Sequence, residues 1–240
     1  MSSDSRSGSS HGPLARLLAD TPAQVAEIDP RQIPPDAGLF PEESAAISKA
    51  VSSRRQQYTA GRCLARDAWQ RLGQAPVALL NDEHRVPIWP AGVIGTITHT
   101  HVWCAVAVAR RDEVFGLGAD VEAATALELG LWERVCRPEE REFLRAQPAA
   151  LAGLLGKAIF SAKESIYKAL YPSVRSFLDF QAMRIELTPP AAGVRTDWLW
   201  HAELQVPWGH LRPGQRFGPG KLSIDAELIL SAIVLSASGR

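Results

Sequence analysis

Apolar and polar positions alternate along the chain in a way that predicts a helix followed by strands, and this order occurs twice. The first helix begins at Pro41-Glu-Glu, because proline and acidic residues favour the first helical turn, and it is predicted to run to Leu72, with Gly73 ending it. Its apolar stripe consists of Tyr58, Leu64, Ala65, Ala68, Trp69 and Leu72, and the same spacing places Arg54, Arg55, Arg62 and Arg66 largely on other faces.

Three strand signals follow this helix in quick succession, at residues 93–98, 102–109 and 114–122. Short polar turns such as Arg110-Arg-Asp separate them. Because short connections favour antiparallel neighbours, we expect these segments to form a meander. Residues 21–41, which are rich in proline, are expected to form an extended surface connection before the first helix.

The second half repeats the order of elements without a residue-level repeat. Arg137-Pro-Glu-Glu begins one helix, and a longer one spans 151–170, which Pro172 prevents from continuing far. Strands are predicted at 183–187, 198–205 and 227–235. We therefore expect an α+β fold of two similar, pseudo-symmetric lobes, each a helix on a small antiparallel sheet. The expected boundaries are a disordered tail at 1–12, an N-terminal lobe at 13–112 and a C-terminal lobe at 113–240.

Composition argues against some classes of partner but does not identify the function. The chain has 240 residues, 46% of them hydrophobic, with 26 basic and 26 acidic side chains. This balance gives no sign of nucleic acid or an anionic membrane as a partner, and no apolar stretch is long enough to span a bilayer. The Ser-rich start lacks the apolar core of a signal peptide, and the widely spaced Cys63, Cys104 and Cys136 fit reduced thiols, so a cytoplasmic location is expected.

Two carboxylates share one face of the third predicted strand. In Gly116-Leu-Gly-Ala-Asp-Val-Glu122, Asp120 and Glu122 lie two residues apart, and the glycines leave space beside them. Both could reach one cation, and all-oxygen ligands favour Mg²⁺ over zinc. An isolated pair of this kind also occurs at strand ends that only face solvent.

A third acid lies on the long second helix. Glu164 and Lys168 are i, i+4 neighbours, with Lys163 alongside, a pairing that is also common on helix surfaces. Earlier in the chain, Thr98 and His99 lie where a predicted strand runs into a turn, and there a hydroxyl and an imidazole can donate to a phosphate. His99 and His101 could instead suggest a transition metal, but no further histidine or cysteine has metal-like spacing.

Taken in order, these segments resemble the 4′-phosphopantetheinyl transferases of the enterobactin and surfactin type. The pattern of that family has a basic helix with G-R, W-P, S-x-x-H-S, G-x-D-x-E and W-x-x-K-E-x-x-x-K. The segments of this chain are 54–62 ending in Gly-Arg, Trp89-Pro, Thr96-Ile-Thr-His-Thr100, Gly118-Ala-Asp-Val-Glu122 and Phe160-Ser-Ala-Lys-Glu-Ser-Ile-Tyr-Lys168. The match covers roughly residues 38–187. Phe160 replaces tryptophan and Thr98 replaces serine, which leaves every charged group in place.

The resemblance implies a magnesium enzyme, with Mn²⁺ as a possible substitute, that transfers the phosphopantetheine arm of coenzyme A to a serine of an apo acyl or peptidyl carrier protein. By resemblance, Asp120, Glu122 and Glu164 hold the metal, Glu164 accepts the serine proton, and Lys168 stabilises the leaving phosphate. The residues expected to bind coenzyme A are Arg54, Arg62, His84, Arg85, Thr98, His99, Asp120, Lys163 and Lys168.

Alternatives and partners remain open on the sequence alone. A magnesium-dependent phosphoesterase or nucleotidyl transferase could use the same acids with water as the nucleophile, and a non-catalytic coenzyme A-binding module is a third reading. A monomer is expected from two lobes in one chain. The carrier could serve fatty-acid, polyketide, nonribosomal-peptide or siderophore synthesis, including secondary metabolism.

Overall fold

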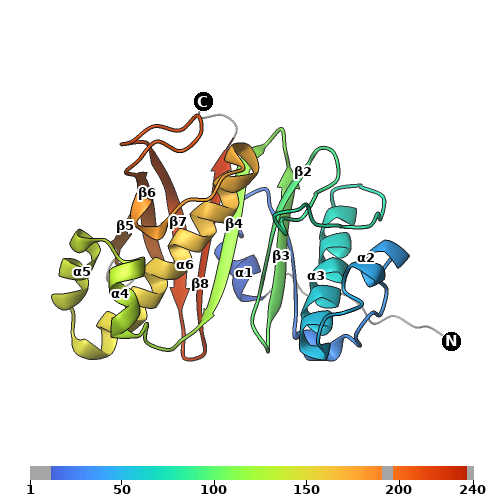
Figure 1. Ribbon diagram of the computed structural model, residues 1–240, viewed down its shortest axis with the longest axis horizontal. Coiled ribbons are helices and arrows are strands. Elements are labelled where there is room, and N and C mark those ends of the chain that lie inside the picture. The colour runs from blue at the N-terminus through green and yellow to red at the C-terminus, as the bar shows by residue number, and fades with distance from the viewer. Residues whose placement is uncertain (1–11, 191–196, 237–240) are drawn as a thin grey trace.

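The computed structural model describes residues 12–190 and 197–236, and within them it forms an α+β fold with two antiparallel sheets. The predicted tail at 1–12 lies, apart from Gly12, outside the described residues. In Figure 1 the two sheets stand side by side, each with one long helix, and β3 and β4 face each other at the centre. No helix in the described parts of the chain combines the length and apolarity that a bilayer crossing requires.

The first sheet has three strands in the order β1-β3-β2, and the helix α3 packs against all three. A buried cluster that includes Trp69, Leu79 and Val106 fills the space between helix and sheet. The elements of this half are α1 (Pro13–Leu17), β1 (Gln24–Ile28), η1 (Pro30–Gln32), α2 (Pro41–Ala46), α3 (Ser52–Gln70), β2 (Val93–His99) and β3 (Cys104–Arg110).

The second sheet has five strands in the order β4-β8-β7-β6-β5, and the long helix α6 packs on β4 and β8. Its core includes Leu155, Ile159, Trp200 and Ile233. The elements are β4 (Val114–Ala123), α4 (Leu129–Val135), α5 (Pro138–Arg145), α6 (Ala149–Val174), η2 (Phe180–Ala182), β5 (Met183–Thr188), β6 (Trp198–Leu204), β7 (Arg216–Ile224) and β8 (Leu228–Ser236).

The predicted first helix is two helices in the structure, because the chain turns between α2 and α3. Glu43 of α2 is fully buried, and its Oε1 lies 2.8 Å from Nη1 of Arg66 on α3. This ion pair holds α2 back against α3. Arg62 and Arg66, which the spacing placed largely on faces other than the apolar stripe, are both buried in the structure.

The three predicted strands β2, β3 and β4 exist, but the predicted meander was wrong for the third. β2 pairs with β3, whereas β4 pairs with β8, with Asp120 opposite Ser231. On the other edge of β4, the hydroxyls of Thr96 and Thr98 accept from the backbone nitrogens of Ala119 (3.2 Å) and Val121 (2.9 Å). These two amide groups of β4 would have paired with a neighbouring strand in a meander, and the two hydroxyls accept their hydrogen bonds instead.

Candidate active site

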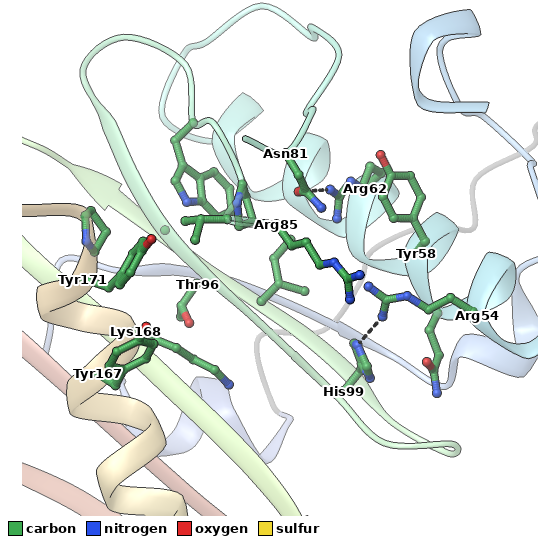
Figure 2. A pocket seen from close by; sticks show the side chains of 17 residues that line it. Arg54, Tyr58, Arg62, Asn81, Arg85, Thr96, His99, Tyr167, Lys168 and Tyr171 are labelled. Carbon is green, nitrogen blue, oxygen red and sulfur yellow. Dashed lines mark hydrogen bonds between the residues drawn. The ribbon is translucent and has the colours of Figure 1, made fainter. Parts of the chain in front are cut away.

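A cleft of about 250 Å³ opens between the two halves of the molecule. Its walls come from α3, β2, the loop that joins them, and the C-terminal end of α6. Figure 2 shows Arg54, Arg62 and Arg85 on one side and Lys168 with Tyr167 on the other. Because three arginines and one lysine border this cavity, the cleft attracts an anion.

The loop between α3 and β2 separates two neighbouring residues that were both expected to bind coenzyme A. Oδ1 of Asp82 accepts from the backbone nitrogens of His84 and Val86, both at 2.9 Å, and Arg85 between them has φ +65°. This tight turn places Arg85 on the cleft lining, whereas His84 is exposed and does not line the cleft. The structure gives His84 no place on the cleft lining.

Arg62 is held rigidly at the cleft wall. Its Nε donates to the carbonyl of Leu79 (3.0 Å), its Nη2 donates to Oδ1 of Asn81 (2.6 Å), and its guanidinium carbon lies 3.7 Å from the centre of the Tyr58 ring. A guanidinium group has five N–H donors, so these contacts leave donors for a ligand. A prepositioned arginine loses little side-chain entropy when it binds a phosphate.

Arg54 and His99 contact each other at the cleft. Nη1 of Arg54 lies 3.1 Å from Nε2 of His99. Burial lowers the pKa of His99, and the positive charges of Arg54 and Lys168 lower it further. A neutral His99 can accept a hydrogen bond through Nε2, which orients the Arg54 guanidinium at the cleft.

The floor of the cleft is made by a tryptophan lying against β2. A Cβ at Gly95 would come within 2.7 Å of the Trp89 ring, so only glycine allows this close contact. Tyr167 and Tyr171 of α6, with ring centres 5.3 Å apart, contribute aromatic surface on the opposite wall. The cleft thus combines flat apolar surface with cationic groups.

The strand and the helix that carry the predicted acids are neighbours, because α6 lies directly on β4. A Cβ at Gly118 would sit 1.9 Å from the carbonyl oxygen of Ser165, so this glycine permits the contact. Behind it, Ser161 donates to the carbonyl of Asp120 (3.3 Å), and its hydroxyl lies 2.9 Å from that of Ser231 on β8. These contacts fix the height of α6 over the strand that carries Asp120 and Glu122.

Asp120 and Lys168 connect the acidic cluster to the basic cleft. Nζ of Lys168 lies 2.7 Å from Oδ1 of Asp120 and 3.1 Å from the carbonyl oxygen of Ala119, and Lys168 also lines the cleft. The second carboxylate oxygen, Oδ2 of Asp120, is buried without a hydrogen-bond partner. A buried, unsatisfied carboxylate oxygen is costly unless a ligand or cation completes it.

The other two acids are close enough to Asp120 to feel its charge. Burial raises the pKa of Glu122, and so does the negative charge of Asp120, while Lys157 acts in the opposite direction. Burial also raises the pKa of Glu164, with further contributions from Asp120 and Glu122 opposed by Lys168. The three acids therefore form one electrostatic cluster.

The donor chemistry of this cluster fits a hard divalent cation. It offers carboxylate oxygens alone, one of them unsatisfied, and mutual repulsion that a cation would relieve. In the described residues, no group of three His, Cys, Asp or Glu side chains is already gathered in a metal-binding geometry. Lys168 and Lys157 instead neutralise Asp120 and Glu122 (2.7 and 3.4 Å).

The structure does not bring Lys163 or Thr98 to the cleft. Nζ of Lys163 donates to the carbonyls of Val135 (2.7 Å) and Phe180 (2.9 Å) and to Oε2 of Glu140 (2.7 Å), so all three donors are used inside the protein. The Thr98 side chain is buried toward β4. Both were expected to contact coenzyme A phosphates, and both positions are corrected because these side chains stabilise the packing between elements.

Four residues at the site were not singled out from the sequence. Asn81, Tyr167 and Tyr171 line the cleft, and Lys157 pairs with Glu122. Lys157 lies seven residues before Glu164, two helical turns away on the same face, so helical spacing could have found it. Asn81 and Arg85 belong to an irregular loop, which gives no periodic signal.

Comparisons with known proteins match both parts of the chain to one family. Residues 42–109 match the 4′-phosphopantetheinyl transferase N-terminal domain, and residues 116–210 match the 4′-phosphopantetheinyl transferase superfamily. The chain is 34% identical to the 4′-phosphopantetheinyl transferase Npt of Nocardia iowensis over 218 residues, which cover 90% of this chain and 96% of Npt.

Two further relatives carry the same description. Identity is 35% over 202 residues to Svp of Streptomyces mobaraensis, covering 83% of this chain and 79% of Svp. It is 32% over 210 residues to PptT of Mycobacterium tuberculosis, covering 84% of this chain and 88% of PptT. Enterobactin synthase component D of Escherichia coli K12 is 31% identical over 158 residues, 65% of this chain and 74% of that protein. The chain therefore belongs to the 4′-phosphopantetheinyl transferases, a family of transferase enzymes.

Proposed function

We propose that the chain transfers the 4′-phosphopantetheine arm of coenzyme A to a serine of an apo acyl or peptidyl carrier protein, with Mg²⁺ held by Asp120, Glu122 and Glu164. One observation carries this proposal: Lys168 touches the carboxylate cluster and lines the cationic cleft at the same time. A pyrophosphate lying across that junction would meet cations on one side and a metal site on the other.

The adenosine 3′,5′-bisphosphate end of coenzyme A would occupy the cleft. Arg54, Arg62 and Arg85 would pair with its phosphates, and the neutral His99 would orient Arg54 by accepting its hydrogen bond. The Trp89 face and the tyrosines of α6 offer aromatic surface for the adenine ring. Lys168 would then contact the pyrophosphate.

When bound, the metal ion would neutralise charge on the pyrophosphate oxygens as the leaving group departs. The serine Oγ forms a bond to the β-phosphorus, and the bond from that phosphorus to the bridging oxygen breaks. The leaving group is adenosine 3′,5′-bisphosphate.

Glu164 would take the serine proton. Its raised pKa makes it a stronger base than an ordinary glutamate. Lys168 would stabilise the charge on the departing phosphate from the opposite side. Positioning and electrostatics account for most of the expected rate enhancement.

The lobe boundary near residue 113 and a monomeric, cytoplasmic enzyme are part of the same proposal. They are supported by the turn between β3 and β4, by two sheets carried on a single chain, and by the free thiols of Cys63, Cys104 and Cys136. Mn²⁺ would substitute for Mg²⁺ because both accept oxygen ligands.

Mass spectrometry of an apo carrier protein tests this function. The carrier is incubated with the chain, coenzyme A and Mg²⁺, and we expect one added phosphopantetheine, lost when EDTA replaces Mg²⁺. Free phosphopantetheine without carrier modification would instead indicate hydrolysis, with water in place of the serine. No mass gain across acyl and peptidyl carriers would contradict the proposal.

A further inference from the structure

Lys157 is the one cation at the carboxylate cluster, within the described residues, that lies outside the coenzyme cleft. Its Nζ is 3.4 Å from Oε2 of Glu122, and only 17% of the Lys157 side chain is exposed. Lys157 is absent from the cleft lining, whereas Lys168 belongs to it. The two lysines thus approach the three acids from different directions along α6.

The charges of the cluster nearly balance without a metal. Lys157 pairs with Glu122 and Lys168 pairs with Asp120, so the three acidic side chains already share two basic ones. Lys168 can turn toward a pyrophosphate in the cleft that it lines. Lys157 pairs with Glu122 and lies outside that lining, so a ligand in the cleft offers it no alternative partner.

We infer that Lys157 is a positioning residue that acts through Glu122 as a permanent counter-cation and keeps divalent metal affinity low until coenzyme A supplies its phosphate charge. The inference rests on the proposed metal site. A dication approaching the free enzyme meets Lys157 at Glu122, and repulsion between like charges opposes its binding. Bound pyrophosphate adds negative charge and pairs with Lys168, so the site then attracts a dication more strongly than Lys157 repels it. Metal and coenzyme A therefore favour each other's binding, as linkage requires.

Titration of the full chain with Mn²⁺, followed by the EPR signal of free Mn²⁺, tests this role without a transfer assay. Each protein is titrated alone and with saturating coenzyme A, against a blank of coenzyme A and Mn²⁺. For Lys157→Met alone, we expect a Kd for Mn²⁺ at least about tenfold lower than that of the wild type, and therefore a smaller gain on adding coenzyme A. Lys157→Gln, whose side chain is uncharged but polar, should behave in the same way.

Two variants serve as matched controls. Lys157→Arg keeps the charge, and Lys221→Met removes an equal charge from β7, where Lys221 pairs with Asp20. Lys221 lies in register with Ala232, as does Ala119, so it projects from the sheet face opposite Asp120. Both controls should stay within about twofold of the wild-type Kd.

A Lys157→Met chain that melts like the wild type and binds Mn²⁺ with wild-type or weaker affinity would overturn the inference. If Asp120→Asn abolishes Mn²⁺ binding in the same series, the metal site stands and only the role of Lys157 fails. If Asp120→Asn binds Mn²⁺ as the wild type does, the proposed metal site fails, and the inference fails with it.

Discussion

Lys163 and Lys168 lie five residues apart on α6, and they do different work. The Lys163 side chain is 2% exposed, and its ammonium group donates to three protein oxygens. Lys168 is 29% exposed, donates to two oxygens and borders the cleft. An ammonium group has three donors, so Lys168 keeps one for a ligand and Lys163 keeps none.

The number of free N–H donors therefore distinguishes a lysine that can bind a ligand from one that stabilises the fold, even within a single motif. Both lysines belong to Lys-Glu-Ser-Ile-Tyr-Lys168, and both were expected to contact phosphate. The α5 helix makes Lys163 a structural residue. Its Glu140 accepts from Lys163 and also from the backbone nitrogen of Ile185 (2.6 Å). Lys163 therefore joins α5, α6 and the start of β5.

The largest predicted effect is on folding. Lys163→Met leaves Glu140 buried without its counter-ion, which should lower the free energy of unfolding by ~3–5 kcal/mol in urea denaturation. The double variant Lys163→Met with Glu140→Gln should recover part of the loss, because it removes the uncompensated charge. Coenzyme A affinity of the folded protein should not change. A stable Lys163→Met chain that no longer binds coenzyme A would reverse the roles of the two lysines.

Lys168→Met should show the opposite profile. We expect transfer to the carrier to fall by ~10²–10³-fold, as when one preorganised charge-stabilising donor is removed. The loss of stability should be smaller than for Lys163→Met, and Mg²⁺ should restore part of it, because the ion can replace the ammonium group beside Asp120. Single-turnover transfer and thermal melts with and without Mg²⁺ measure both effects. Wild-type transfer by this variant would remove Lys168 from the mechanism.

His99→Ala should have a moderate effect that falls on binding. Losing the partner that orients Arg54 should raise the Kd for coenzyme A by ~5–10-fold, close to the net value of one ordinary hydrogen bond. The maximal rate of transfer should change less. Calorimetric titration with coenzyme A checks this, with His84→Ala as the matched control, since His84 is exposed outside the cleft. Equal effects of the two variants would contradict the distinction.

The smallest predicted effect is on the stability of the metal-free chain. Burial and the charges of Asp120 and Glu122 raise the pKa of Glu164, so the folded chain holds this proton more tightly than the unfolded chain does. Ionised Glu164 therefore costs stability as pH rises from the unfolded value of 4.5 through the raised value.

Glu164→Gln removes this cost. Without divalent ions, the variant should melt at a higher temperature than the wild type at pH 8, and the difference should shrink as pH falls toward 4.5. A lower melting temperature for the variant at pH 8 would show that Glu164 stabilises the fold.

Local patterns predicted the strand that carries Asp120 and the helix that carries Glu164. The strand of Asp120 and the helix of Glu164 have clear periodicities, and the glycines beside Asp120 indicated the close approach that Gly118 makes to Ser165. The sheet that receives β4 could not be predicted in this way, because its partner β8 lies more than a hundred residues later and nothing local identifies it.

Two strands were missed for different reasons. β7 contains Gly218-Pro-Gly, a sequence typical of a turn. In the strand, Gly220 instead makes room for the Trp200 ring, which a Cβ would approach to 2.2 Å. β1 lies inside the proline-rich segment that was interpreted as a surface connection. The basic cleft was predicted only in part, since Asn81 and Arg85 reach it from an irregular loop.

The most direct test of the account compares transfer by the wild type and by Asp120→Asn across a range of Mg²⁺ concentrations, with the modified carrier quantified by mass spectrometry. This substitution nearly preserves the shape of the side chain while removing the charge that joins the cleft to the carboxylate cluster. We predict one phosphopantetheine per carrier for the wild type, dependent on Mg²⁺, and none for a variant that melts as a folded protein. Equal, Mg²⁺-dependent transfer by both proteins would contradict the assignment of Asp120, Glu122 and Glu164 as the metal site.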